Sequence, residues 1–166
     1  MKVDAITTMS EPSKALTIVP FDPKYRTAFL ELNEAWLEQY FLLEPYDIQV
    51  LRNPEDMILA PGGEVYFGLI NEAVVATFAL TPRKKGVMEL NKMAVRNDQR
   101  SQGIGHQLMA FLINLGKRRG FNAIELYSHT SLESAIHLYQ KFGFQEIPMP
   151  ADCVYDRADI RMQLTL

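Results

Sequence analysis

An arginine and two glycines, spaced as Arg100-x-x-Gly103-x-Gly105, form a pattern that suits the binding of phosphate. Apolar residues recur at helical spacing from Ile104 to Leu115, which predicts that the glycines lie at the N-terminus of a helix. Such an end presents free backbone N–H groups and the positive pole of the helix dipole, and both favour an anion. Glycines let a pyrophosphate approach these N–H groups, and Arg100 adds a fork of donors beside them.

Three phosphate-binding schemes compete for this segment, and spacing separates them. A Walker loop requires G-x-x-x-x-G-K followed by Ser or Thr, and the chain has no such run. A dinucleotide fingerprint requires a third small residue, but Leu108 stands at that position and the preceding loop is long. Glu125 lies near the place of a ribose-binding acid, yet the rest of that pattern fails. The third scheme is an R-x-x-G-x-G loop after a strand that ends in Met-Ala-Val.

A second segment downstream makes this third scheme more specific. It runs Ala135-Ile-His-Leu-Tyr139-Gln-Lys-Phe-Gly143-Phe144 and follows another predicted strand. Together, the two segments resemble the coenzyme A loop and the A-x-x-L-Y-x-K-x-G-F segment of the GNAT superfamily of acyl-CoA-dependent N-acyltransferases. The resemblance covers roughly residues 64–166 well and the first third by general layout. One departure from the family pattern is Leu132, where many relatives carry Asn; some family subsets use Thr-x-Leu, as in Thr130-Ser-Leu132.

The resemblance implies acetyl-CoA as co-substrate and assigns the residues that bind it. In this fold the strand before the glycine loop diverges from its neighbour, and its free edge pairs with the pantetheine arm as an added strand would. The backbone amides that follow hold the pyrophosphate, with Arg100 nearby. The predicted cofactor-binding residues are Met93, Ala94, Val95, Arg100, Ser101, Gln102, Gly103, Ile104, Gly105 and His106.

Two residues carry the predicted chemistry. Acids near the position of Glu89 serve many GNAT enzymes as general base, often through water, and Tyr139 resembles the tyrosine that protonates or hydrogen-bonds the coenzyme A sulfur. Each has an alternative: Glu89 as a solvated strand residue, and Tyr139 as a core aromatic whose hydroxyl finds a partner. The single cysteine, Cys153, lies outside both motifs. Direct attack of the amine in a ternary complex is therefore preferred to a covalent cysteine mechanism.

The acceptor side is predicted from aromatic and acidic residues in the first third of the chain. In GNAT-like folds the connection after the first helix borders the acceptor, so Trp36, Tyr40, Glu44 and Asp47 are candidate substrate-binding residues. Carboxylates beside aromatic rings suit a cationic amine, either a small molecule or a peptide. The alternative is that the aromatic residues here simply cover the sheet.

The elements that must position these residues follow from periodicity and breakers. Predicted helices occupy residues 23–40, 47–52 and 104–119, and a fourth helix ends near Gly143. Predicted strands occupy residues 16–20, 64–70, 73–80, 87–95, 122–127, 144–147 and 157–166. This order is that of an α/β (α+β) fold of GNAT type, with a mixed central sheet of about seven strands flanked by about four helices. Residues 1–14 are polar and patternless, so a flexible tail is predicted before a single domain at 15–166.

Composition limits the other classes of function. A net charge of −3 gives no electrostatic footprint for nucleic acid or an anionic membrane, and no apolar run could span a bilayer. We expect a cytoplasmic protein. The three histidines lack metal-ligand spacing, so no metal site is predicted. A homodimer is implied only by the family resemblance. Two other hypotheses stay open: a GNAT-like domain that senses acyl-CoA without turnover, and a nucleic-acid regulator, which the missing basic face disfavours.

Overall fold

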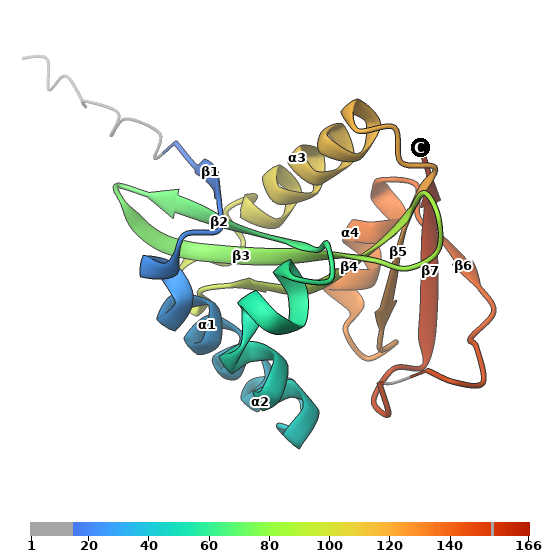
Figure 1. The fold of residues 1–166 in the computed structure, drawn as a ribbon, viewed down its shortest axis with the longest axis horizontal. Helices are drawn as coiled ribbons and strands as arrows, with labels where there is room; N and C mark the ends of the chain where they lie inside the picture. The colour runs from blue at the N-terminus through green and yellow to red at the C-terminus, as the bar shows by residue number, and fades with distance from the viewer. Residues whose placement is uncertain (1–14, 154) are drawn as a thin grey trace, which may run out of the picture.

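A mixed sheet of seven strands forms the centre of the computed structural model, which describes residues 15–153 and 155–166 (Figure 1). The strand order is β1-β2-β3-β4-β5-β7-β6. Only β4 and β5 are parallel neighbours; the other pairs are antiparallel. The sheet confirms the predicted fold class, and the predicted tail lies outside the described residues. The strands are β1 (Thr17–Pro20), β2 (Glu64–Ile70), β3 (Ala73–Pro82), β4 (Val87–Val95), β5 (Ala123–Ser128), β6 (Gln145–Ile147) and β7 (Ile160–Thr165).

Helices cover both faces of this sheet, and strands β2 and β3 alternate their apolar side chains between two cores. On β2, Tyr66 joins one core while Val65 and Phe67 join the other. Helices α1 (Arg26–Tyr40) and α2 (Pro45–Arg52), with the π-helical turn η2 (Glu55–Leu59), pack on the second core. Helices α3 (Ile104–Arg118) and α4 (Glu133–Lys141) pack on the first. Two 3-10 turns complete the order: η1 (Pro23–Tyr25) and η3 (Asn97–Gln99). None of the helices among the described residues has the length and apolarity to cross a membrane.

Two of the predicted boundaries that differ from the structure bear on the site, and side-chain contacts explain both. Helix α2 begins at Pro45 rather than Asp47, because the Asp47 carboxylate accepts the backbone N–H of Glu44 and closes the first turn from its third position. Strand β7 begins at Ile160 rather than Arg157. Arg157 instead reaches across to α2, and Asp159 receives two hydrogen bonds from Thr130. Residues 157–159 thus belong to the site rather than to the sheet.

Strands β4 and β5 pair along only part of their length. Their register runs from Val87–Ala123 to Leu90–Leu126. Beyond that point β4 continues to pair with β3 as far as Val95, and β5 continues with β7 to Ser128. The two strands therefore part after Leu90, as the family resemblance implied, and the backbone of β4 is left with a free edge in the middle of the sheet.

A bulge in β4 lies at the same point. Thr77 pairs with Ala94 and Ala79 with Asn91, so β4 has one more residue than β3 between these pairs. Lys92 lies in the bulge with a φ of +53°, a left-handed conformation that is uncommon for a residue with a side chain. The bulge bends β4 where it leaves β5 and directs the following residues toward α3.

Candidate active site

The predicted glycine loop forms one wall of a large groove. Ser101 and Gly103 have φ values of +62° and +77°, and Gly103 caps α3 without a side-chain hydrogen bond. A β-carbon added at Gly103 would meet no atom of the described residues within 4 Å, so no neighbouring side chain crowds the loop at this point. The first N–H groups of the helix and its dipole favour an anion here.

This groove has a volume of about 890 Å³ and runs from the end of β4 past α3 to α4. Of the ten predicted cofactor-binding residues, nine line the groove and Gln102 does not. The nine are Met93, Ala94, Val95, Arg100, Ser101, Gly103, Ile104, Gly105 and His106. The loop, the helix end and the free edge of β4 thus border one continuous surface, called the large groove below. A groove of this shape fits an extended ligand with a phosphate end and an amide-bearing arm.

Arg100 is held at the rim of the large groove by α1. Its Nη1 donates to Gln39 Oε1 at 2.7 Å and to the Tyr40 hydroxyl at 3.2 Å, and its Nε donates to the Val95 carbonyl at 3.3 Å. The guanidinium also lies over the Tyr40 ring. Tyr40, predicted for the acceptor side, therefore lies in the large groove beside Arg100 and helps to hold that cation at the groove.

A small cavity of about 110 Å³ opens on the other side of the parting between β4 and β5. Its lining includes Leu90 to Met93 of β4 and Leu126 to Ser128 of β5, with Trp36 of α1 above them. Four residues line both this small cavity and the large groove: Trp36, Met93, Leu132 and Tyr139. The two spaces therefore meet at the split in the sheet, with the Tyr139 side chain at the junction.

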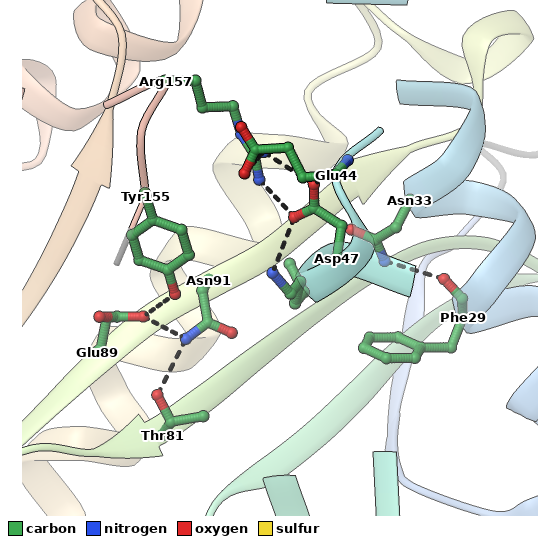
Figure 2. Close-up of polar contacts among 10 residues, drawn as sticks. Phe29, Asn33, Glu44, Asp47, Thr81, Glu89, Asn91, Tyr155 and Arg157 are labelled. Carbon is green, nitrogen blue, oxygen red and sulfur yellow. Dashed lines mark hydrogen bonds and ion pairs between the residues drawn. The ribbon is translucent and has the colours of Figure 1, made fainter. Parts of the chain in front are cut away.

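Glu89 lies in the wall of the small cavity and is only 1% exposed. Its Oε2 accepts from the Tyr155 hydroxyl at 2.8 Å and from Asn91 Nδ2 at 2.6 Å (Figure 2). Arg83 Nη2 lies 3.2 Å from Oε1, but Oε1 accepts no hydrogen bond from the described residues. Two hydrogen bonds thus fix Oε2, whereas Oε1 has the ion pair with Arg83 alone.

Tyr155 supports this arrangement. Burial, and then the negative charge of Glu89, raise the pKa of its hydroxyl well above the usual value. Tyr155 consequently keeps its proton and remains a donor to Glu89 Oε2 across the physiological range. Its ring lies against Tyr127, and Lys92 Nζ lies 5.6 Å from the ring centroid.

Tyr139 is half-buried on α4 and packs against Phe144. Burial raises the pKa of its hydroxyl to about 12, so the group is protonated at neutral pH. A protonated hydroxyl at the junction of the two spaces can donate a hydrogen bond to a negative charge that develops there.

Asp47 and Glu44, the two predicted acceptor-binding acids, line neither space. Asp47 is 1% exposed and accepts two hydrogen bonds from Arg157, at 2.9 and 2.7 Å (Figure 2). Glu44 lies 3.8 Å from the same guanidinium, and Lys92 Nζ lies 4.0 Å from Asp47. Both acids thus face cations of the protein, and Asp47 reaches the small cavity only through Arg157 and Lys92, which do line it. Trp36 alone of the four predicted residues borders the cavity.

Replacing Asp47 with asparagine is expected to lower the free energy of unfolding by about 3 kcal/mol at neutral pH, because it leaves the buried Arg157 and Lys92 uncompensated. Burial raises the pKa of Asp47, but the bonds from Arg157 and the Glu44 backbone outweigh this and leave it lowered. The carboxylate therefore stabilises the fold above its unfolded pKa of about 3.9, and this contribution is lost as the pH falls through the lower folded pKa.

Urea unfolding of the two proteins, repeated at several pH values, measures this difference. Glu44→Gln is the matched control, because Glu44 is partly exposed and lies farther from the same arginine; we expect it to cost less than about 1 kcal/mol. Equal losses for both variants would show that the Asp47–Arg157 pair has no special weight.

Sequence reasoning missed several polar residues that line the small cavity. Tyr155 and Arg157 lie outside both motifs, in the connection between β6 and β7, and this connection brings them to the cavity. Asn91 and Lys92 lie two and three residues after Glu89, and alternation alone would have placed Asn91 on the same face as Glu89. No sequence signal marked the bulge that brings Lys92 into the same cavity.

Comparison with known proteins decides the family. The model of the Acetyltransferase (GNAT) family matches residues 27–144. The chain belongs to the GNAT acetyltransferase family. An N-acetyltransferase of Bacillus subtilis, itself uncharacterised, is 28% identical over 105 residues, which are 61% of this chain and 68% of the relative. The ribosomal protein bS18-alanine N-acetyltransferase of Escherichia coli is 35% identical over 86 residues, 51% of this chain and 58% of that enzyme.

Solved structures of GNAT proteins share the fold. A GNAT-family acetyltransferase from Staphylococcus aureus superposes with a TM-score of 0.81 at 23% identity, covering 91% of this chain and 99% of that one. A GNAT acetyltransferase from Elizabethkingia anophelis, solved with acetyl-CoA bound, gives 0.64 at 21% identity, covering 91% and 98%. The predicted family, fold and enzyme class are confirmed, and these matches do not favour a domain that only senses acyl-CoA.

Proposed function

We propose that this GNAT acetyltransferase transfers an acetyl group from acetyl-CoA, held in the large groove, to a primary amine held in the small cavity. The observation that carries the proposal is the meeting of the two spaces at Trp36, Met93, Leu132 and Tyr139. A thioester in one space and an amine in the other would face each other there. Direct attack in a ternary complex then needs no covalent enzyme intermediate.

The large groove suits acetyl-CoA by its donor set. The N-terminus of α3 and Arg100 would hold the pyrophosphate, and the open space at Gly103 leaves room for it. The free edge of β4, from Met93 to Val95, would pair with the amides of the pantetheine arm. Acetyl-CoA supplies the activated acyl group; the remaining steps belong to side chains of the protein.

Glu89 is the proposed general base. A protonated amine has no lone pair, so a proton must leave before the nitrogen attacks. Tyr155 and Asn91 occupy Glu89 Oε2, so Oε1, beside Arg83 but without a hydrogen bond from the described residues, would accept that proton through a water molecule. A new carbon–nitrogen bond then forms as the carbon–sulfur bond breaks; the nitrogen gives up its second proton to solvent, and the thiolate takes up a proton from solvent as coenzyme A leaves.

Tyr139 is the proposed stabiliser of the leaving sulfur. A phenol with a pKa of about 12 is a weaker acid than an ordinary thiol, whose pKa is about 8.5. Complete transfer of its proton to a thiolate would run uphill, so a hydrogen bond to the sulfur is the role that the chemistry favours. The proposal covers both a small-molecule amine and a peptide amine as acceptor. The Escherichia coli relative is named for an alanine of a ribosomal protein, which is an acceptor of the second type.

Calorimetric titration with acetyl-CoA tests the cofactor half of this proposal. Gly103→Glu is expected to weaken binding by at least about 10-fold, because it places a side chain and a negative charge before the helix end. Gly120→Glu is a matched control: Gly120 has a φ of +73° and the same open surroundings, but it lies beyond the opposite end of α3.

Both variants carry a similar backbone strain, so a shared loss of stability is expected. Only Gly103→Glu should lose affinity for acetyl-CoA. Equal affinity of both variants, or no binding by the folded wild-type protein, would remove the proposed cofactor site.

A further inference from the structure

The acceptor side of the site has a cation that the proposed reaction does not use. Lys92 lines the small cavity, and its side chain is 7% exposed. A buried ammonium is costly unless a carboxylate or several hydrogen bonds compensate it. Burial lowers the pKa of Lys92, and the attraction of Asp47 does not reverse that effect.

The carboxylates near Lys92 are already engaged. Asp47 lies 4.0 Å from Nζ, but both of its oxygens accept shorter bonds from Arg157. Glu89 is held by Tyr155, Asn91 and Arg83. Glu44 is partly in solvent and 3.8 Å from Arg157. Lys92 and Arg157, two cations at the wall of the cavity, therefore share one buried carboxylate, Asp47, which lies behind that wall.

The backbone at Lys92 adds a second, independent observation. Its left-handed φ of +53° costs of the order of 1 kcal/mol for a residue with a β-carbon, and glycine or asparagine would adopt it more readily. The bulge turns a long cationic side chain into the space beside Glu89. Strain combined with a poorly compensated charge at a cavity wall is typical of a binding residue rather than of a structural one.

We infer that the acceptor amine also carries a carboxylate, which Lys92 binds with help from Arg157, so that the substrate is a compound of amino acid size. This inference rests on the proposed function. The amine would face Glu89 and Tyr139 while the carboxylate faces Lys92. Arg157 spends two of its five N–H donors on Asp47 and keeps others for a ligand. The small cavity, at about 110 Å³, is far smaller than the large groove at about 890 Å³, which favours a compact acceptor.

The test compares matched pairs of acceptors on the full-length protein. Standard α-amino acids and ω-amino acids are offered beside their carboxamides, which keep the amine and lose the negative charge. Release of coenzyme A gives kcat and KM for each compound. For the amino acid that is acetylated, we expect the wild-type kcat/KM to be about 10-fold to 100-fold higher than for its carboxamide. The difference should come from a lower KM for the acid.

Lys92→Met keeps the length of the side chain and removes its charge. We expect the preference for the acid over the amide to fall to about one, while Lys84→Met, in the exposed loop before β4, retains the wild-type preference. A readout without turnover is calorimetric binding of the acid to protein saturated with coenzyme A, which Lys92→Met should lose. Lys92→Met is also expected to melt at a higher temperature than the wild type, because a buried charge is gone.

The outcomes separate the inference from the proposed function. Equal use of acid and amide by the wild-type protein overturns the inference whether or not the variant folds, and so does an equal loss of both substrates in Lys92→Met. A third outcome is that the protein binds acetyl-CoA and acetylates no compound in the panel, but does acetylate a peptide or an amine without a carboxylate. This outcome overturns the inference and leaves the proposed function standing. Failure to bind acetyl-CoA overturns both.

Discussion

Tyr139→Phe is expected to lower kcat by about 10²-fold to 10³-fold while acetyl-CoA binds within about threefold of the wild-type affinity. The ring would still pack against Phe144 and line both spaces, so only the hydroxyl at the junction is removed. The lost hydrogen bond matters most when negative charge develops on sulfur. The effect should therefore fall on kcat rather than on cofactor affinity.

Tyr66→Phe is the control for this change. The Tyr66 hydroxyl bonds Glu64 and Arg119 and lines neither space, so its loss should leave kcat near the wild-type value. The pH profile gives a further check. With its pKa raised to about 12, Tyr139 keeps its proton as the pH rises, so kcat should not fall between about pH 7 and 10 through loss of that proton. Wild-type turnover by Tyr139→Phe would exclude it from the chemistry.

Glu89→Gln is expected to lower kcat/KM by about 10²-fold to 10³-fold at neutral pH, where most of the amine is protonated. The loss should shrink as the pH rises toward the pKa of the amine, about 8 for the α-amino group of a peptide and higher for a free amino acid, because the free amine then needs no base. A pH profile of both proteins measures this difference.

Glu125→Gln provides a matched control for the buried charge. Glu125 lies opposite Glu89 in the parallel pair of β4 and β5, is 3% exposed, and pairs with Arg161 and Arg83, but it does not line the small cavity. We expect a loss of stability in both variants and a large loss of turnover only in Glu89→Gln. A similar loss of turnover in both, without pH dependence, would mean that Glu89 acts through structure alone.

The parts of the site that sequence predicted are those with local signals. The glycine loop is a single turn, and Gly103 has a positive φ that glycine adopts readily. The Ala135–Phe144 segment is one helix and its cap. Helical and strand periodicity sufficed for the element order, and β2 and β3 alternate their apolar side chains between the two cores.

The parts that sequence did not predict depend on long-range pairing. Asp47 and Arg157 are 110 residues apart, and their contact turns a predicted acceptor-binding acid into the support of a cavity-lining cation. Tyr155 reaches Glu89 across 66 residues. The left-handed bulge at Lys92 arises from a register mismatch between β3 and β4, which depends on two strands rather than one. A cytoplasmic location and a homodimer stay predictions.

One measurement tests the central claim most directly: release of coenzyme A from acetyl-CoA in the presence and absence of the amine panel, with the products identified by mass spectrometry. The proposal predicts release that depends on the amine, saturates with it, and yields one acetylated amine per coenzyme A. Tyr139→Phe and Glu89→Gln should lose this release while Tyr66→Phe and Glu125→Gln keep most of it. Acetyl-CoA hydrolysis at the same rate without any amine, and no acetylated product, would contradict a reaction between ligands of the two joined spaces.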